Sequence, residues 1–200
     1  MKKWIVISAS VISLLGTAFA QELKIGEPAP AFEAKDTKGN TVKLADYAGQ
    51  FVVLEWTNPD CPFVKKHYGS GNMQKLQKTY TDKGVIWLTV CSSAQGKQGH
   101  YLADEWNKMV AEKGIASTAV LLDEDGTVGH LYGASNTPHL FVMSPDGTLI
   151  YQGAIDSVRS TDSADIAGAK NYVAAALDEA LAGKPVTEAL TQPYGCGVKY

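Results

Sequence analysis

The chain has 200 residues, 45% of them hydrophobic and 20% charged, which is the composition of an ordinary globular protein. Its formal net charge of −3 gives it no general attraction for nucleic acid or for an anionic membrane. Its three cysteines are too few for a disulfide scaffold, and in an oxidising compartment they allow at most one internal pair with one thiol left over.

The chain begins with the pattern of a secretory signal peptide at residues 1–20. Two lysines precede the apolar residues 5–15, and Ala18-Phe19-Ala20 forms a small-x-small cleavage site. The apolar run is too short for a membrane span, and the clean cleavage site disfavours an uncleaved N-terminal anchor. We therefore expect a mature protein that begins at Gln21, has 16 basic and 21 acidic residues, lies in the periplasm and carries no membrane anchor.

A hairpin and then a buried strand follow the signal peptide. The hairpin joins residues 31–34 to residues 41–44 across a turn at residues 36–40. Residues 51–56 are a short, β-branched and almost wholly apolar run, which predicts a buried strand. Asn58-Pro59-Asp60 then has the composition of a turn.

Cys61, directly after this turn, is the predicted centre of the site. Pro62 suits the first position of a helix, because its missing N–H would be unpaired there in any case. Cys61 then occupies the helix N-cap, where unpaired N–H groups and the helix dipole favour a thiolate. Lys65 and Lys66 would add to this effect, so we expect a lowered pKa and a reactive Cys61 thiol. An inert core cysteine is the alternative.

The rest of the chain alternates helices and strands. The helix after Cys61 is expected to stop at Gly69-Ser70-Gly71 and to restart at Asn72. The later elements are a strand over residues 85–90, a helix over residues 101–113 with Leu102 and Trp106 inward, a strand over Ala119–Leu122, a hairpin of residues 140–143 with 148–151, and a long helix over residues 163–181. Such alternation implies parallel strands joined by crossover helices. We thus predict one α/β domain at residues 21–182 and an irregular tail at residues 183–200.

Two segments of the chain resemble the thioredoxin-fold superfamily. They are Trp56-Thr57-Asn58-Pro59-Asp60-Cys61-Pro62 and Asn136-Thr137-Pro138-His139, each beside an apolar strand. In element order, residues 23–181 are similar to extracytoplasmic redoxin proteins, which merge into the alkyl hydroperoxide reductase, thiol-specific antioxidant and peroxiredoxin group.

The resemblance implies a thioredoxin-like three-layer α/β fold, with a mixed central sheet, flanking helices and an N-terminal hairpin, and it implies no cofactor. It also implies a cis Thr137–Pro138 bond that faces Cys61, with Thr57, Pro62, Thr137 and Pro138 as supporting residues. An ordinary trans-proline at the start of a strand is the alternative for Pro138.

The chain departs from both branches of this group. Val64 stands where thioredoxins carry the second cysteine of Cys-x-x-Cys, so that dithiol mechanism is not available. Asn58 and Leu54 stand where peroxiredoxins carry a Thr or Ser and a Pro, and Thr57 lies one residue too early. The single arginine, Arg159, lies outside the stretch that matches the peroxiredoxin arginine. Cys61 is the residue that both branches share.

Two other cysteines are candidates for reaction with oxidised Cys61. Cys196 lies between two glycines on a Pro-containing tail, so it can reach the site as a resolving thiol. A frayed terminus with an idle thiol is the alternative. Cys91 ends the second strand and is expected to be a buried core thiol, although its pairing with Cys61 stays open.

Glu55 and two histidines complete the candidates. Glu55 would relay protons if it is buried beside Cys61 and would be merely solvated on a sheet edge. His67 and His100 could join Cys61 in a copper site. No known ligand spacing supports a metal, so we predict none.

These residues predict an extracytoplasmic thiol-dependent oxidoreductase with Cys61 as its nucleophile. Attack of the Cys61 thiolate on sulfur or on a peroxide oxygen would give a mixed disulfide or a sulfenic acid. The partners would be a thiol or disulfide protein, or a hydroperoxide, and an external thiol as electron donor. A redox-inactive binding or copper-chaperone module is the alternative from another class.

Overall fold

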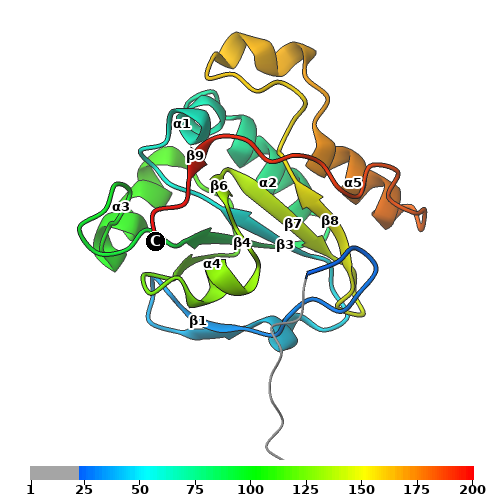
Figure 1. Ribbon diagram of the computed structural model, residues 1–200, viewed down its shortest axis with the longest axis horizontal. Helices are drawn as coiled ribbons and strands as arrows, with labels where there is room; N and C mark the ends of the chain where they lie inside the picture. The colour runs from blue at the N-terminus through cyan, green and yellow to red at the C-terminus, as the bar shows by residue number, and fades with distance from the viewer. Residues whose placement is uncertain (1–22) are drawn as a thin grey trace, which may run out of the picture.

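The computed structural model describes residues 23–200 as a seven-stranded mixed sheet with helices packed on its faces (Figure 1). The expected signal peptide lies outside the described residues. A second sheet contains β6 (Asn136–Thr137) and β9 (Cys196–Gly197). Within residues 23–200, no helix has both the length and the apolar character that a membrane crossing requires.

The strand order of the main sheet is β2-β1-β5-β4-β3-β7-β8. Its central strands β3 (Val52–Trp56), β4 (Ile86–Cys91) and β5 (Ala119–Leu122) are parallel, as the alternation of strands and helices predicts. The predicted N-terminal hairpin is present as β1 (Glu33–Asp36) and β2 (Thr41–Lys43), and the closing hairpin as β7 (His139–Met143) and β8 (Leu149–Gly153). The predicted three-layer α/β architecture is confirmed.

The helices agree with the sequence prediction at the first crossover and differ from it later. They are α1 (Pro62–Gly69), α2 (Asn72–Thr81), α3 (Ala103–Lys113), α4 (Thr127–Leu131) and α5 (Tyr172–Leu181), with short 3-10 helices η1 (Leu44–Tyr47) and η2 (Ser163–Gly168). The predicted interruption between α1 and α2 is confirmed. The short helix α4 was not predicted.

Two details of the helix prediction are wrong. Leu102 is not on the inner face of α3; it is the N-cap residue and is 62% exposed. The long helix expected over residues 163–181 is divided into η2 and α5. The break occurs because residues 170–172 pair with residues 155–157, and because the Asn171 side chain accepts the Ala174 N–H at 2.8 Å and starts a new helix.

The core lies on both faces of the sheet because the side chains of a strand alternate between its two faces. On one face, α1, α2 and α5 pack against alternate strand residues, among them Val53, Trp87, Leu140, Val142 and Tyr151. On the other face, α4 and the N-terminal segments cover the residues between them, among them Leu54, Trp56, Leu88, Val90 and Phe141. Cys61 belongs to the first of these clusters.

The C-terminal tail is more ordered than the sequence predicts. Residues 189–200, called the strap below, cross the sheet near the carboxyl ends of its parallel strands, from the side of α5 toward α3 and α4 (Figure 1). Within the strap, β9 (Cys196–Gly197) pairs antiparallel with β6 (Asn136–Thr137). Backbone hydrogen bonds join the strap to Gln152, Ser135 and Ala94. These contacts place Cys196 at the edge of the sheet where Cys61 lies.

Candidate active site

Cys61 occupies the N-cap of α1, as the sequence predicts. The turn after β3 is closed by Cys61 N–H, which donates to the Asn58 carbonyl at 3.0 Å, and by Asp60 N–H, which donates to Asn58 Oδ1 at 2.9 Å. Pro62 stands at the first helical position, and the Cys61 carbonyl accepts the Lys65 N–H at 2.8 Å. The sulfur is thus fixed at the start of a helix, and Cys61 is 0% exposed.

The Thr137–Pro138 loop faces Cys61, as expected from the resemblance. The Thr137–Pro138 bond is cis. β3 and β7 pair antiparallel with Trp56 opposite His139, so this loop lies just beyond the end of β3. The Cys61 thiol donates to the Thr137 carbonyl at 3.1 Å. The prediction of a cis bond beside Cys61 is therefore confirmed.

Cys196 lies next to this pair because β9 places it opposite Thr137. Both Cys61 and Cys196 pack in the same cluster, Cys61 fully buried and Cys196 partly exposed. The strap comes so close that a Cβ at Gly195 would lie 2.1 Å from the Thr137 carbonyl oxygen, and Gly195 has φ +120°. A glycine at this position therefore allows the cysteine beside it to reach the site.

The three thiols have different acidities. Burial raises the pKa of Cys61, but hydrogen bonds from the Cys196 thiol, the Thr137 side chain and the Val64 N–H outweigh it, so the Cys61 pKa is lowered. Burial and the neighbouring Cys61 raise the pKa of Cys196 to about 11. Burial also raises the pKa of Cys91. Cys61 is thus the first of the three to become a thiolate.

The lysines that the sequence analysis placed beside Cys61 have other partners. Lys65 is largely exposed and lies 3.7 Å from Asp60. Lys66 is buried, 3.5 Å from Asp156. The expected direction of the Cys61 pKa is found, but its physical cause is the hydrogen-bonding surroundings of the sulfur rather than these two charges.

Cys91 lies in a separate part of the core. It is 3% exposed, its thiol approaches the Gly99 carbonyl at 3.4 Å, and it packs with Trp106 and Val120 in a cluster with α3. The structure therefore brings Cys61 together with Cys196 and leaves Cys91 as the buried core thiol that its position on β4 indicates.

Glu55 is fully buried rather than solvated on an edge. Its carboxylate accepts hydrogen bonds from Tyr68 Oη at 2.7 Å, Trp87 Nε1 at 2.8 Å and Gln77 Nε2 at 3.0 Å. Burial outweighs these bonds and raises the Glu55 pKa to about 7. Since these donors come from α1, α2 and β4, the carboxyl group joins both helices to the sheet beneath the site.

The histidines considered as copper ligands lie apart from Cys61. His67 faces Asp156 at 3.7 Å, and His100 faces Glu124 at 3.1 Å. Over residues 23–200, no group of three His, Cys, Asp or Glu side chains is arranged to hold a metal ion. His67 and His100 thus face Asp156 and Glu124 rather than joining Cys61.

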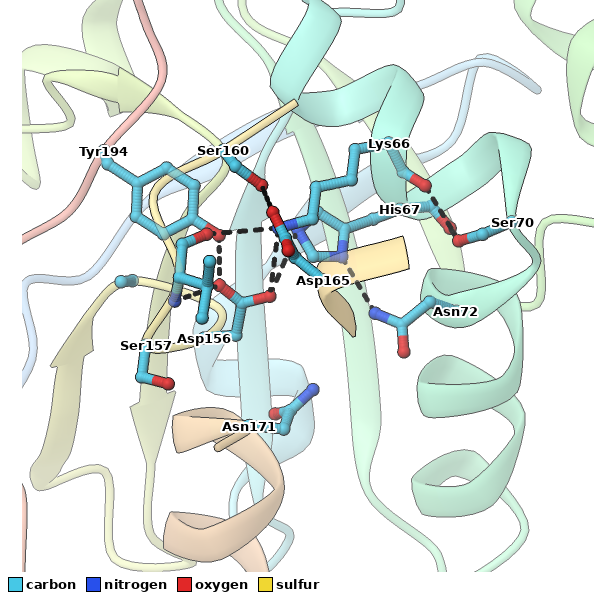
Figure 2. Close-up of polar contacts among 12 residues, drawn as sticks. Lys66, His67, Ser70, Asn72, Asp156, Ser157, Ser160, Asp165, Asn171 and Tyr194 are labelled. Atoms are coloured by element: carbon cyan, nitrogen blue, oxygen red, sulfur yellow. Dashed lines mark hydrogen bonds and ion pairs between the residues drawn. The ribbon is translucent and has the colours of Figure 1, made fainter. Parts of the chain in front are cut away.

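Sequence reasoning missed the buried polar cluster beside α1. Figure 2 shows Tyr194 and His67 directed at Asp156 from opposite sides, with Lys66 next to them. Asp156 is 3% exposed and Lys66 3% exposed. A tyrosine two residues before Cys196 was the available signal, but the sequence does not reveal that its hydroxyl meets a buried carboxylate.

Comparisons with known proteins agree with this geometry. The model of the AhpC/TSA family matches residues 25–152. A Clostridium pasteurianum protein assigned as a peroxiredoxin in the rubredoxin operon is 26% identical over 144 residues, covering 65% of this chain and 78% of that protein. The thiol-disulfide oxidoreductase ResA of Bacillus subtilis strain 168 is 24% identical over 148 residues, covering 73% of this chain and 77% of ResA.

A solved structure shows the same fold. The thioredoxin domain of a thiol-disulfide oxidoreductase from Bacteroides vulgatus superposes with a TM-score of 0.51 at 23% identity, covering 74% of this chain and 97% of that domain. The mixed sheet and its helices thus form a thioredoxin-like fold.

Proposed function

Since this chain belongs to the AhpC/TSA family, we propose that it is an extracytoplasmic thiol oxidoreductase whose redox couple is Cys61 and Cys196. The proposal is carried by one observation: β9 pairs with β6 so that Cys196 stands opposite Thr137, whose carbonyl accepts the Cys61 thiol at 3.1 Å. Cys196 thereby takes the resolving role that Val64, at the usual position of a second cysteine, cannot take. Thr57, Pro62, Thr137 and Pro138 support the site.

The first reaction that this couple supports is disulfide exchange. The Cys61 thiolate attacks one sulfur of a substrate disulfide and releases the other sulfur as a thiolate, leaving a mixed disulfide. Cys196 then loses its proton, attacks the Cys61 sulfur and releases the second substrate thiolate. The substrate gains two electrons, and the protein is left with a Cys61–Cys196 disulfide that an external thiol reduces.

The acidities suit this order of events. Cys61 has the lowered pKa and attacks first, while a nearby Cys61 helps raise the pKa of Cys196 to about 11. Once Cys61 is bonded to substrate it has no charge, so this repulsion disappears and Cys196 becomes easier to ionise. Reaction of Cys61 thus removes its own contribution to the raised Cys196 pKa, while the larger contribution of burial remains.

Hydroperoxide reduction is the second candidate, and the complete burial of Cys61 favours it, because a small peroxide reaches a covered sulfur more easily than a protein does. The Cys61 thiolate would attack one peroxide oxygen and release an alcohol or water, giving a sulfenic acid. Cys196 would then displace water to form the same disulfide. Arg159 is exposed on the loop after β8, which leaves this chemistry without the arginine that peroxiredoxins use.

A single-turnover experiment tests the couple and chooses between the substrates. Reduced protein receives one equivalent of a peptide disulfide or of hydrogen peroxide, and the free thiols that remain on the protein are counted with time by mass spectrometry. The wild type and Cys91→Ser should each lose two thiols, Cys196→Ser should lose one and retain an adduct, and Cys61→Ser should lose none. The faster substrate in the wild type identifies the reaction. Loss of two thiols in Cys61→Ser would contradict the proposed nucleophile, and no reaction in any variant would favour a redox-inactive binding module.

The location is part of the same proposal and rests on the N-terminal sequence. We expect export across the inner membrane, cleavage after Ala20 and a periplasmic mature chain, with the folded domain at residues 21–182 followed by the tail at residues 183–200. N-terminal sequencing of the protein recovered from the periplasm should begin at Gln21. An intact Met1 in a membrane fraction would contradict cleavage and favour an N-terminal anchor.

A further inference from the structure

The strap covers Cys61 and is held on both sides of Cys196. Upstream, the Tyr194 hydroxyl donates to Asp156 Oδ1, and the Tyr194 ring lies 5.8 Å from the ring of Phe63. Downstream, the Tyr200 ring stacks on His130 at 3.9 Å and its hydroxyl donates to the Ala134 carbonyl at 2.7 Å. Cys196 is therefore held between two tyrosine contacts, and it lies beside the fully buried Cys61.

The upstream contact is made to a buried charge. Asp156 Oδ1 also accepts the Val158 N–H at 3.1 Å, and Asp156 Oδ2 lies 3.5 Å from Lys66 Nζ (Figure 2). Lys66 Nζ in turn donates to the Val158 carbonyl at 3.1 Å. A hydrogen bond to a buried carboxylate is stronger than one between neutral groups, and leaving such a carboxylate short of a donor is costly.

His67 completes the surroundings of Asp156. Its Nδ1 lies 2.8 Å from the Asn72 side-chain amide, which donates to it, so the ring hydrogen is on Nε2 and faces Asp156 Oδ2 at 3.7 Å. Burial lowers the His67 pKa to about 4, so the ring is neutral at neutral pH. Asp156 therefore keeps Lys66 as its charged partner, and the Tyr194 hydroxyl is the one contact in this set that the strap supplies.

We propose that Asp156 and Tyr194 are positioning residues that hold Cys196 over Cys61 and thereby control access to the Cys61 sulfur. The contacts of Asp156 suit this role because they connect the chain segments that carry the two cysteines. Lys66 is on α1, whose N-cap is Cys61, and Tyr194 lies two residues before Cys196. The proposal rests on the proposed function and deepens it, since it says what must open before substrate reacts.

The positioning role of Asp156 and Tyr194 does not change the chemistry of disulfide formation. Oxidised Cys61, as a sulfenic acid or a mixed disulfide, is attacked by the Cys196 sulfur, and water or the substrate thiolate leaves as the Cys61–Cys196 bond forms. Docking of the strap raises the effective concentration of Cys196 at Cys61. Undocking exposes Cys61 to its substrate.

The test is the alkylation of reduced protein by iodoacetamide, followed separately at each cysteine by mass spectrometry across a range of pH. Tyr194→Phe keeps the ring against Phe63 and removes only the hydroxyl bond to Asp156. We expect its plateau rate at Cys61 to rise about tenfold, the factor that corresponds to about 1.4 kcal/mol, with a further rise in Tyr194→Ala. The plateau reports opening of the strap, whereas the midpoint reports the Cys61 pKa, so the two effects are separated.

Two controls make the result specific. Tyr80→Phe also removes one buried hydroxyl bond, to the Ala174 carbonyl at 2.9 Å, but does not touch the strap, so its Cys61 rate should equal that of the wild type. Cys91 is 3% exposed beneath α3 and serves as an internal reference for general loosening of the fold. An equal rise at Cys91 and Cys61, or a Tyr80→Phe rate as high as that of Tyr194→Phe, would overturn the positioning role.

A second variant displaces the strap by a substitution outside it, at a glycine that contacts Tyr200. A Cβ at Gly129 would lie 2.5 Å from the Tyr200 ring and 2.8 Å from the Ser92 hydroxyl, so Gly129→Ala should displace Tyr200 and increase Cys61 alkylation, with the rate at Cys91 showing whether the core around Ser92 is also disturbed. At Gly168 nothing lies within 4 Å, and Gly168→Ala should not increase Cys61 alkylation. Unchanged alkylation in Tyr194→Phe would overturn the inference, whatever the result for Gly129→Ala. If the wild type forms no Cys61–Cys196 disulfide, the proposed function itself fails; if it forms one while these variants alkylate normally, only the positioning role fails.

Discussion

At the scale of single residues, Cys61 lies where the sequence predicts it, but the sequence does not indicate why its pKa is lowered. The Cys-Pro pair after a turn predicts the N-cap position of Cys61, because this inference needs only local chain geometry. The partners that lower its pKa, Thr137 and Cys196, come from distant segments. The assignment of Lys65 and Lys66 to the sulfur failed because side-chain direction around a helix depends on what the rest of the fold supplies, here Asp60 and Asp156.

The first prediction concerns the acidity of Cys61. Because the Cys196 thiol donates to the Cys61 sulfur and lowers its pKa, Cys196→Ala should raise the Cys61 pKa. Cys196→Ser keeps a donor and should raise it less. Thiolate absorbance of the reduced proteins in a Cys91→Ser background measures the midpoints. Equal midpoints in the wild type and Cys196→Ala would show that the second thiol does not stabilise the thiolate.

The second prediction concerns Glu55, whose pKa is raised from 4.5 to about 7 in the folded protein. Between these two pH values the unfolded chain has released a proton that the folded protein keeps, so this group lowers the free energy of unfolding as pH rises. The loss is on the order of 3 kcal/mol, at about 1.4 kcal/mol per pKa unit, and it is complete above about pH 7.

His67 and His139 act in the opposite direction, since burial lowers each pKa from 6.5 to about 4 and their contribution is lost as pH falls below 6.5. The measurement is therefore the difference between the wild type and Glu55→Gln in urea unfolding from pH 5 to pH 8. Relative to Glu55→Gln, the wild type should lose free energy of unfolding as pH rises. A difference that stays constant with pH would mean that Glu55 titrates alike in both states.

At the scale of elements, the periodicity of apolar residues was sufficient for the central strands and for α1 and α2. The periodicity does not predict a helix boundary that a single polar capping residue sets, or a helix that is too short to show a period. Asn171 caps α5 and ends what looks like a continuous helical pattern, while α4 has only the five residues Thr127–Leu131, too few to show a period. The strap was predicted to be irregular because its two-residue strand is formed by pairing with β6, which local sequence does not encode.

The third prediction uses the two glycines that flank Cys196. A Cβ at Gly195 would lie 2.1 Å from the Thr137 carbonyl oxygen at a φ of +120°, whereas at Gly197 the nearest atom would be 3.9 Å away. Gly195→Ala should shift the strap by about 1 Å and slow formation of the Cys61–Cys196 disulfide by on the order of a hundredfold. Gly197→Ala is the matched control and should react like the wild type.

The rate of Cys61–Cys196 disulfide formation is measured for each variant by adding one equivalent of oxidant to the reduced protein, quenching with acid at different times and quantifying the disulfide. Similar slowing in Gly195→Ala and Gly197→Ala would show that the strap does not need its close approach to Thr137. Wild-type kinetics in Gly195→Ala would contradict the assignment of Cys196 as the resolving thiol.

At the scale of the whole molecule, the thioredoxin-like sheet places three segments far apart in sequence at one edge: the turn before α1, the Thr137–Pro138 loop and the strap. The first two were predicted together from their motifs. For the strap, the sequence indicates only that the tail is long enough to return to the site, because closing a flexible tail onto almost any part of a domain has little extra entropic cost. The β6–β9 pairing and the contacts of Tyr194 and Tyr200 hold the strap at this edge, and they exist only in the folded protein.

The central claim is that Cys61 and Cys196 form the redox couple, and the most direct test is peptide mapping of the oxidised mature protein under non-reducing conditions. The account predicts a single cross-linked pair of peptides, one containing Cys61 and the other Cys196, with Cys91 free and alkylated only after denaturation. A Cys61–Cys91 bridge, or oxidised Cys61 with Cys196 still free, would contradict it.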